Sequence, residues 1–156
     1  MAEPTIKAID FLKQLKKLDK LIENKLSEKE QWKAIATGTT AQMGGERVQS
    51  SGSQQKMADA VEKYIEIEKE IDKRIDELVD AKLDVIGVIE QLNTTEYDVL
   101  HKIYVGVVDP KTKQTIYLTF EEVADIYGKS RSWATTIHGR ALKSVQKILD
   151  TRAKAS

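Results

Sequence analysis

The sequence has few of the residues that fill compact cores, stiffen the backbone or form disulfide bonds. It contains no cysteine, two prolines and only 6% aromatic residues. Without cysteine the chain has neither a disulfide framework nor a cysteine-based zinc site, and this composition fits a reducing cytosol. So few large side chains favour an elongated helical protein over a compact globule.

Long apolar segments are also missing from the chain. No uninterrupted apolar run approaches the roughly 18 residues that a membrane-spanning helix needs. The first twenty residues are charged throughout and have no apolar core of signal-peptide length. We therefore expect no membrane association and a location in the cytoplasm.

The net charge is zero overall, but it changes sign along the chain. Residues 54–92 hold 6 basic and 11 acidic side chains, a net charge of −5, whereas residues 93–156 hold 10 basic and 7 acidic ones, a net charge of +3. From residue 128 onward, 7 basic side chains stand against one acid, Asp150. This asymmetry predicts that any contact with a polyanion lies near the C-terminal end.

Apolar residues recur every three or four positions in two charged stretches, which predicts amphipathic, coiled-coil-like helices in the N-terminal half. The first region covers residues 1–36, with a helical restart at the capping-box pattern Ser27–Glu30. Residues 37–54, rich in glycine, serine and threonine, are expected to form a linker. Residues 55–92 form a long charged helix for oligomerisation or partner docking. We expect it to pack on the first helix as a hairpin, on a second copy as a parallel coil, or on both.

Residues 93–156 form the expected C-terminal domain. Asn93 and Glu96 have the spacing of a capping box before a short helix. Alternating apolar residues on both sides of Asp109–Lys113 predict a small β-hairpin with its turn at Pro110. The predicted fold is therefore mainly α-helical, with one hairpin inserted in the C-terminal part.

The stretch "EEVADIYGKSRSWATTI" (Glu121–Ile137) has the spacing of a helix-turn-helix. The capping box of Thr119 with Glu122 starts a helix at Phe120–Tyr127, Gly128 can take the positive φ of the turn, and Ser130 can cap a final helix to about Leu149. Ala124 is the small residue where the two helices cross. The shared core is expected on one face: Val123, Tyr127, Ala134, Ile137, Ala141, Val145 and Ile148.

The opposite face of the final helix is expected to be a polar, hydroxyl-rich and basic surface without a carboxylate. Arginine can bind guanine through two hydrogen bonds, serine and threonine hydroxyls can meet several bases, and a threonine methyl can touch thymine. Nearby lysines would meet phosphates. The expected DNA-binding residues are Lys129, Ser130, Arg131, Ser132, Trp133, Thr135, Thr136, Arg140, Lys143 and Lys147.

"LTFEEVADIYGKSRSWATTIHGRALKSV" (Leu118–Val145) resembles region 4 of bacterial sigma factors. The resemblance rests on Glu121–Ala124, Gly128–Ser130 and Arg140–Leu142, and "LNTTEYDVLHKIY" is similar to the helix before that motif. With its helical N-terminal half and "ERVQSS" before the long helix, the whole chain resembles phage and prophage activators of the ArpU/RinA type. This resemblance implies a transcriptional activator of phage late genes that acts with host RNA polymerase.

By position in sigma region 4, the resemblance implies that Arg131, Ser132 and Thr136 read the promoter element, whereas Trp133 and Thr135 meet the DNA backbone. Trp133 departs from the charged or polar residue that the family prefers, so packing at the domain edge and stacking on DNA both stay open. The hairpin is longer than the family's short turn. Its tip lysines, Lys111 and Lys113, would touch phosphate like a wing, face polymerase or have no role.

Other candidate sites have no supporting pattern. His101 and His138 lack ligand-like spacing to acids, and His138 is expected to face solvent or phosphate. The acids of residues 62–84 surround a helix as a solvated face, and "QMGGER" lacks the Lys-Ser/Thr of a phosphate-binding loop. We expect no enzyme activity, no metal and no cofactor.

The sequence thus predicts a sequence-specific activator that binds double-stranded DNA at the nucleoid of a bacterial host. Its N-terminal helices would pair it with itself as a homodimer or with RNA polymerase. Two alternatives remain, a DNA-packaging subunit resembling small terminases and a module that docks on polymerase without binding DNA.

Overall fold

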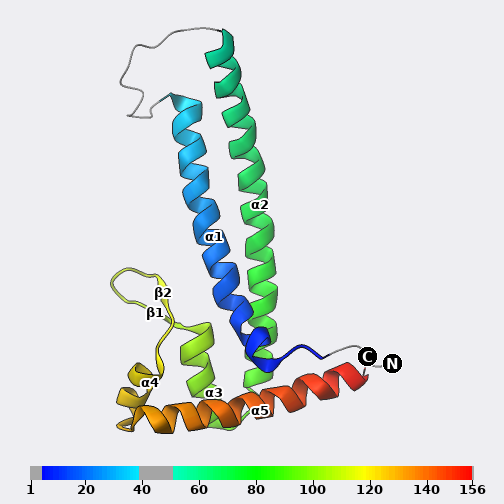
Figure 1. Cartoon of the computed structure of the whole chain (residues 1–156), viewed down its shortest axis with the longest axis vertical. Helices are drawn as coiled ribbons and strands as arrows, with labels where there is room; N and C mark the ends of the chain where they lie inside the picture. The colour runs from blue at the N-terminus through cyan, green and yellow to red at the C-terminus, as the bar shows by residue number, and fades with distance from the viewer. Residues whose placement is uncertain (1–4, 39–50, 156) are drawn as a thin grey trace. The chain divides into compact units, whose positions relative to one another are not determined.

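The computed structural model describes residues 5–38 and 51–155. Within these residues the chain is mainly α-helical, with long N-terminal helices and a small β-hairpin, as the sequence predicts (Figure 1). Contacts divide the chain into two compact units, one of Met1–Lys17 with Val79–Ser156 and one of Leu18–Leu78. The division therefore runs through both long helices, whereas the sequence pattern placed boundaries at residues 37, 55 and 93.

The second unit is built from α1 (Ala8–Thr37) from Leu18 onward and α2 (Ser51–Ile89) up to Leu78. Lys25 Nζ lies 2.9 Å from a Glu70 carboxylate oxygen, and Lys29 Nζ lies 3.3 Å from one of Glu68. These ion pairs join the two helices as a hairpin, which was one of the two predicted arrangements. Ile67 and Ile71 are buried between them.

Two expected boundaries differ from the observed helices. α1 continues without a break through Ser27–Glu30, so the predicted restart there is wrong. Continuity keeps Lys25 and Lys29 one turn apart on the face that meets α2, where their ion pairs stabilise the helical path. α2 already begins at Ser51. Residues 39–50 of the expected linker, with most of "ERVQSS", lie outside the described residues.

The first unit packs α3 (Thr94–Leu100) and α4 (Phe120–Tyr127) against the long final helix α5 (Arg131–Ala155). Its core also takes apolar residues from the start of α1 and the end of α2. The side chain of Gln146 fixes the start of α1: its Oε1 accepts from Ala8 N–H at 2.8 Å, and its Nε2 donates to Ile6 O at 3.1 Å. The core residues are Ala8, Phe11, Leu12, Leu15, Val85, Val88, Ile89, Val99, Leu100, Ile103, Tyr104, Val105, Val123, Ala124, Ala134, Ala141, Val145 and Leu149.

α3 continues into a π-helical turn, η2 (His101–Val105), which leads to the predicted hairpin of β1 (Val107–Val108) and β2 (Thr115–Ile116). The strands pair antiparallel, Val107 opposite Ile116. The chain turns between η2 and β1 at Gly106, whose φ is +89° and whose N–H donates to His101 O at 2.7 Å. An added Cβ there would lie 2.7 Å from Thr115 Cγ2, so this turn requires glycine.

Candidate nucleic-acid interface

Local hydrogen bonds define the two helices of the predicted helix-turn-helix. Thr119 Oγ1 accepts from Glu122 N–H at 3.2 Å, and Thr119 N–H donates to Glu122 Oε1 at 3.0 Å, which completes the capping box. Gly128 has φ +64° and ψ +34°, and Lys129 N–H donates to Ala124 O at 2.9 Å. Ser130 Oγ accepts from Trp133 N–H at 3.2 Å and caps α5. These predicted caps and this turn are confirmed.

The contact between α4 and α5 is built from small and branched apolar side chains. Val123, Ala124 and Ala134 are buried, so the predicted crossing point at Ala124 is confirmed. Tyr127, Ile137 and Ile148, expected in the core, are only half-buried. Leu149 is buried in the last turns.

Trp133 packs on Tyr127, with ring centroids 4.9 Å apart, and is half-buried. Tyr127 donates to the Asp98 carboxylate from α3, which also pairs with Lys102. Burial acts to raise the pKa of Asp98, but the hydrogen bonds from Lys102 and Tyr127 outweigh it and hold that pKa below its usual value. Burial and the Asp98 hydrogen bond raise the pKa of Tyr127 to about 12. Trp133 thus helps to fix α4 on α5.

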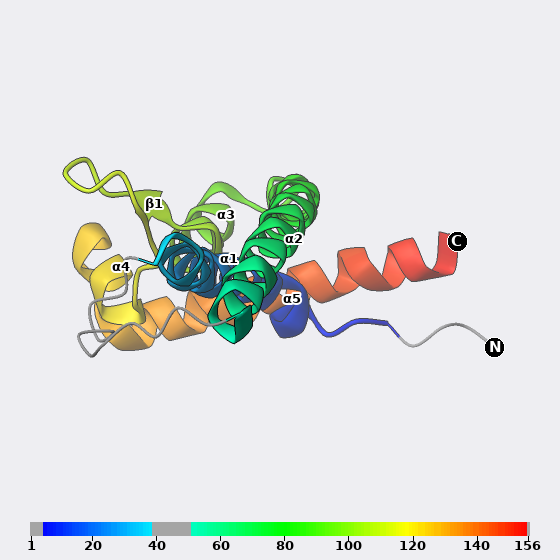
Figure 2. The same cartoon turned by 90° about the horizontal axis from the view of Figure 1, so that it is seen from above.

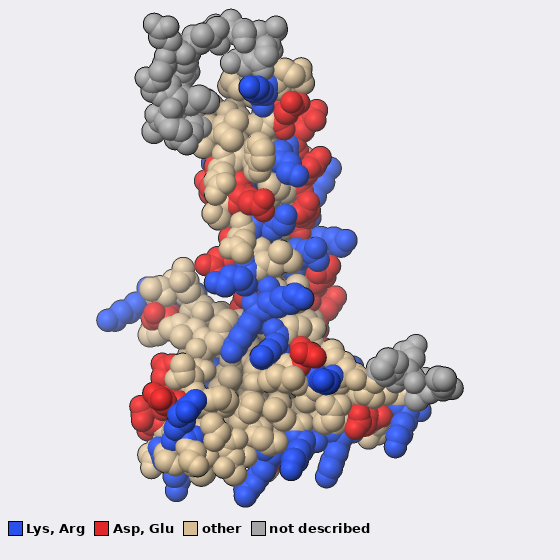
Figure 3. All heavy atoms as spheres, in the orientation of Figure 1, with Lys and Arg blue, Asp and Glu red and all other residues tan. Residues whose placement is uncertain are grey.

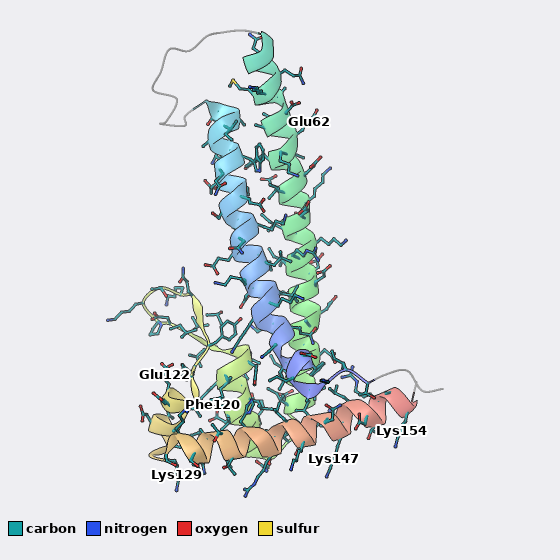
Figure 4. The ribbon with its side chains drawn as sticks, in the orientation of Figure 1. Glu62, Phe120, Glu122, Lys129, Lys147 and Lys154 are labelled. Atoms are coloured by element: carbon teal, nitrogen blue, oxygen red, sulfur yellow. The ribbon has the colours of Figure 1, made fainter. Side chains whose placement is uncertain are left out.

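Apart from Trp133, every residue of the expected DNA-binding set is exposed. Figure 3 shows Lys and Arg side chains projecting in a row from one side of α5, and Lys129, Lys147 and Lys154 lie on that side in Figure 4. α5 ends at Ala155 instead of about Leu149, so Lys154 extends the row. Lys154 is not among the expected DNA-binding residues, although its spacing of seven from Lys147 places both on one helix face.

The hydroxyls of Thr135 and Thr136 both donate to Ser132 O, at 3.0 and 2.9 Å. Their protons are therefore used within α5, while their methyl groups and oxygen lone pairs remain available at the exposed surface. Such a surface can contact the methyl group of thymine or accept a hydrogen bond from a base amine.

One carboxylate lies beside the predicted reading face. Glu121 Oε1 of α4 lies 4.0 Å from Arg131 Nε of α5, and both side chains are exposed. The expectation of a surface without carboxylates holds for α5 alone and is wrong once α4 is in place, because the turn brings Glu121 next to Arg131.

His138 faces inward, which corrects the expectation that it faces solvent or phosphate. A hydrogen bond of 2.6 Å joins its Nε2 to the Tyr104 hydroxyl, and the Phe120 ring meets it edge-on at 4.9 Å. Burial and the charge of Lys16 lower the pKa of His138, and burial raises the pKa of Tyr104 to about 12. The Lys16 ammonium lies 5.0 Å from the centre of the Tyr104 ring, so this cluster links α5 to η2 and α1.

The hairpin projects from the side of α5 opposite to the labelled lysines (Figures 2 and 4). Its tip residues Lys111 and Lys113 are exposed. This placement does not favour the wing-like role considered from the sequence, because the tip and the basic row face different directions.

Across the part of the chain that the structure describes, no three histidine, cysteine, aspartate or glutamate side chains lie close enough to hold a metal ion. Nor does any helix there combine the length and apolarity needed to cross a membrane. Comparison with known family models, curated proteins and solved structures found no match.

Proposed function

We propose that this protein is a sequence-specific DNA-binding activator of phage genes that reads double-stranded DNA with α5. The observation that carries the proposal is the exposed face of a capped helix-turn-helix that presents arginine, hydroxyl and lysine side chains in one row along α5. A helix of this kind fits the major groove, where base edges are distinguishable.

The N-terminal turns of α5 are assigned to the bases. Arg131 would bind guanine, and Ser132 and Thr136 would contact neighbouring bases. The methyl groups of Thr135 and Thr136 favour a thymine in the site, since both hydroxyl protons are already donated to Ser132 O.

The lysines and the second arginine of the row are assigned to phosphates. They are spaced along α5 so that the later ones would follow the DNA backbone after the helix leaves the groove. Their charge is nearly unopposed on α5 itself, where Asp150 is the only acid. The assigned residues are Lys129, Arg140, Lys143, Lys147 and Lys154.

Binding to DNA is tested directly by selection from a random duplex library, followed by fluorescence anisotropy on the selected duplex at increasing salt. Five phosphate contacts predict a slope of about −4.5 for the logarithm of affinity against the logarithm of salt concentration. If no duplex binds even at low salt, the proposal is wrong, and a module that docks on polymerase becomes the better explanation.

Activation through RNA polymerase is tested separately by transcription in vitro. The selected duplex is placed upstream of a core promoter, and we expect more transcript when the protein is added. A matched template with a scrambled site is the control, and equal stimulation of both templates would contradict activation from a specific site.

A further inference from the structure

The second unit buries very little apolar surface for its size. Its large buried apolar side chains within the described residues are Ile22, Ile67 and Ile71. Five others in the same unit are between 39% and 49% exposed: Leu26, Met57, Val61, Ile65 and Ile75. Two helices that leave more large apolar side chains exposed than buried need a further layer to cover them.

Four of these exposed residues form a stripe on α2. Met57, Val61 and Ile65 follow one another at intervals of four, and Ile75 lies 18 residues after Met57, which is about five complete helical turns. Ile75 therefore returns to the same face as Met57, and the stripe runs for about 27 Å at about 1.5 Å per residue. Glu68 and Asp72 interrupt it in the middle.

We propose that this stripe is the interface with a second copy of this chain, with the two α2 helices antiparallel. In this arrangement Met57 of each copy lies opposite Ile75 of the other, and a two-fold axis passes near Glu66. The contact is isologous, so it closes with two copies.

Charge complementarity favours a second copy in this orientation. Glu62 and Lys69 are two turns apart on the same edge of the stripe, and Glu62 projects away from α1 (Figure 4). Among the described residues, neither forms an ion pair within the chain. The antiparallel arrangement brings Glu62 of each copy beside Lys69 of the other, which forms two ion pairs across the axis.

A parallel pairing in register is disfavoured by the same residues. It would place Glu68 and Asp72 against their own copies, and like charges that face each other oppose association. In the antiparallel arrangement Glu68 instead lies beside Ile65 and Asp72 beside Val61 of the other copy, so no acid faces an acid. Glu68 already pairs with Lys29 of α1, 3.3 Å away, so its charge is partly compensated.

The mass in solution gives the first test, measured without DNA by light scattering coupled to size exclusion. We expect twice the chain mass of 17.6 kDa at micromolar concentration. Ile65→Glu should weaken the dimer at least about tenfold, because its carboxylate would lose water on association. Ile126→Glu makes the same substitution at an isoleucine of α4, 60% exposed and outside α2, and should leave the dimer unchanged.

Cross-linking tests the orientation, since the chain has no native cysteine. Met57→Cys and Ile75→Cys proteins with tags of different size are mixed, allowed to exchange and oxidised mildly. We expect a disulfide between the two different chains and little between identical chains. Helical circular dichroism of each variant confirms that it is folded.

A monomeric wild type, or a ring of many subunits, would overturn the proposal, and so would equal weakening by Ile65→Glu and Ile126→Glu. Cross-linking of Met57→Cys with itself and of Ile75→Cys with itself would indicate a parallel pair instead. DNA binding is measured separately through α5 variants, so failure of the dimer and failure of the proposed function are distinguishable.

Discussion

Arg131 and Glu121 form an exposed pair across the turn, at the point where the proposed reading of bases begins. Arg131→Ala should cost about 1–3 kcal/mol of binding free energy and relax the preference at one base pair, because a bidentate contact to guanine is lost. The measurement is anisotropy on the selected duplex and on duplexes with single base-pair changes.

Lys143→Ala is the matched control for Arg131→Ala. Lys143 is exposed on the same helix and is assigned to a phosphate, so its loss should weaken binding to all duplexes alike and make the salt slope shallower by about one. An Arg131→Ala protein with unchanged affinity and unchanged base preference would show that α5 does not read DNA through this residue.

A second prediction at the scale of the residue concerns Gly106. Gly106→Ala should lower the free energy of unfolding by about 1–3 kcal/mol, because alanine is strained at a φ of +89° and its Cβ would meet Thr115 and the Ile116 carbonyl. Gly87→Ala is the control: no atom lies within 4 Å of the added Cβ. Gly87 lies in the last turn of α2, where alanine fits the helical backbone, so the change should stabilise by about 0.4–1 kcal/mol. Urea unfolding of both variants measures these changes in the free energy of unfolding. If Gly106→Ala leaves that free energy unchanged, the turn at Gly106 does not require glycine.

Residue-scale features were predictable from the sequence where they depend on neighbours. The capping box of Thr119 with Glu122, the turn at Gly128 and the cap at Ser130 each involve residues within a few positions, and all three are present. The contact of Tyr104 with His138 joins residues 34 positions apart, so no local pattern could place His138 inward. Whether Trp133 would pack or stack was open for the same reason.

At the scale of the element, the inward-facing His138 makes the attachment of α5 to the rest of its unit depend on pH. Burial and Lys16 lower the pKa of His138, and burial and Lys102 lower that of His101, each below the ordinary histidine value of 6.5. The folded state thus favours neutral rings, so the unfolded chain binds more protons as the pH falls through and below this value. The unfolding midpoint in urea should therefore be lower at pH 5.5 than at pH 7.5.

His138→Gln supplies the control, since glutamine does not titrate and can still hydrogen-bond to the Tyr104 hydroxyl. Its unfolding midpoint should change less between the two pH values, with the remaining change due to His101. Asp98 does not interfere, because its pKa is lowered and its carboxylate stays ionised throughout this range. If the unfolding midpoints of wild type and His138→Gln change equally between the two pH values, the fold does not disfavour protonation of His138.

The apolar periodicity predicted which segments form helices and strands better than it predicted where these elements begin and end. The long helices, the hairpin and the pair α4 and α5 are all present, because their apolar spacing and caps are written in consecutive residues. The false restart at Ser27 arose because the spacing of a capping box can also occur inside a continuous helix, and α1 runs without a break from Ala8 to Thr37. α5 extends beyond Leu149 where Arg152 reaches Asp84 of α2, 3.1 Å away, a contact that the local pattern does not contain.

At the scale of the whole molecule, the unit that holds the helix-turn-helix includes the first turns of α1. Phe11, Leu12 and Leu15 are buried, and contacts group them with residues 79–156. The sequence pattern assigned them to a separate N-terminal region, because amphipathic spacing shows that a helix has an apolar face but not which partner covers it. Helix α5 is therefore predicted to unfold together with the start of the chain.

Leu12→Ala tests this coupling, since Leu12 is fully buried in α1 and distant in sequence from α5. In a Trp32→Phe background, Trp133 is the only tryptophan and its fluorescence follows α5 through urea unfolding. The substitution should lower the free energy of unfolding reported by Trp133 fluorescence by about 2–5 kcal/mol, as for a large-to-small change in a core.

Ile67→Ala is the control, because Ile67 is equally buried but belongs to the second unit, and it should change the unfolding reported by Trp133 less. If Leu12→Ala leaves the Trp133 transition unchanged, α5 folds independently of α1 and the expected boundary at residue 93 describes the folding unit better than the contacts do.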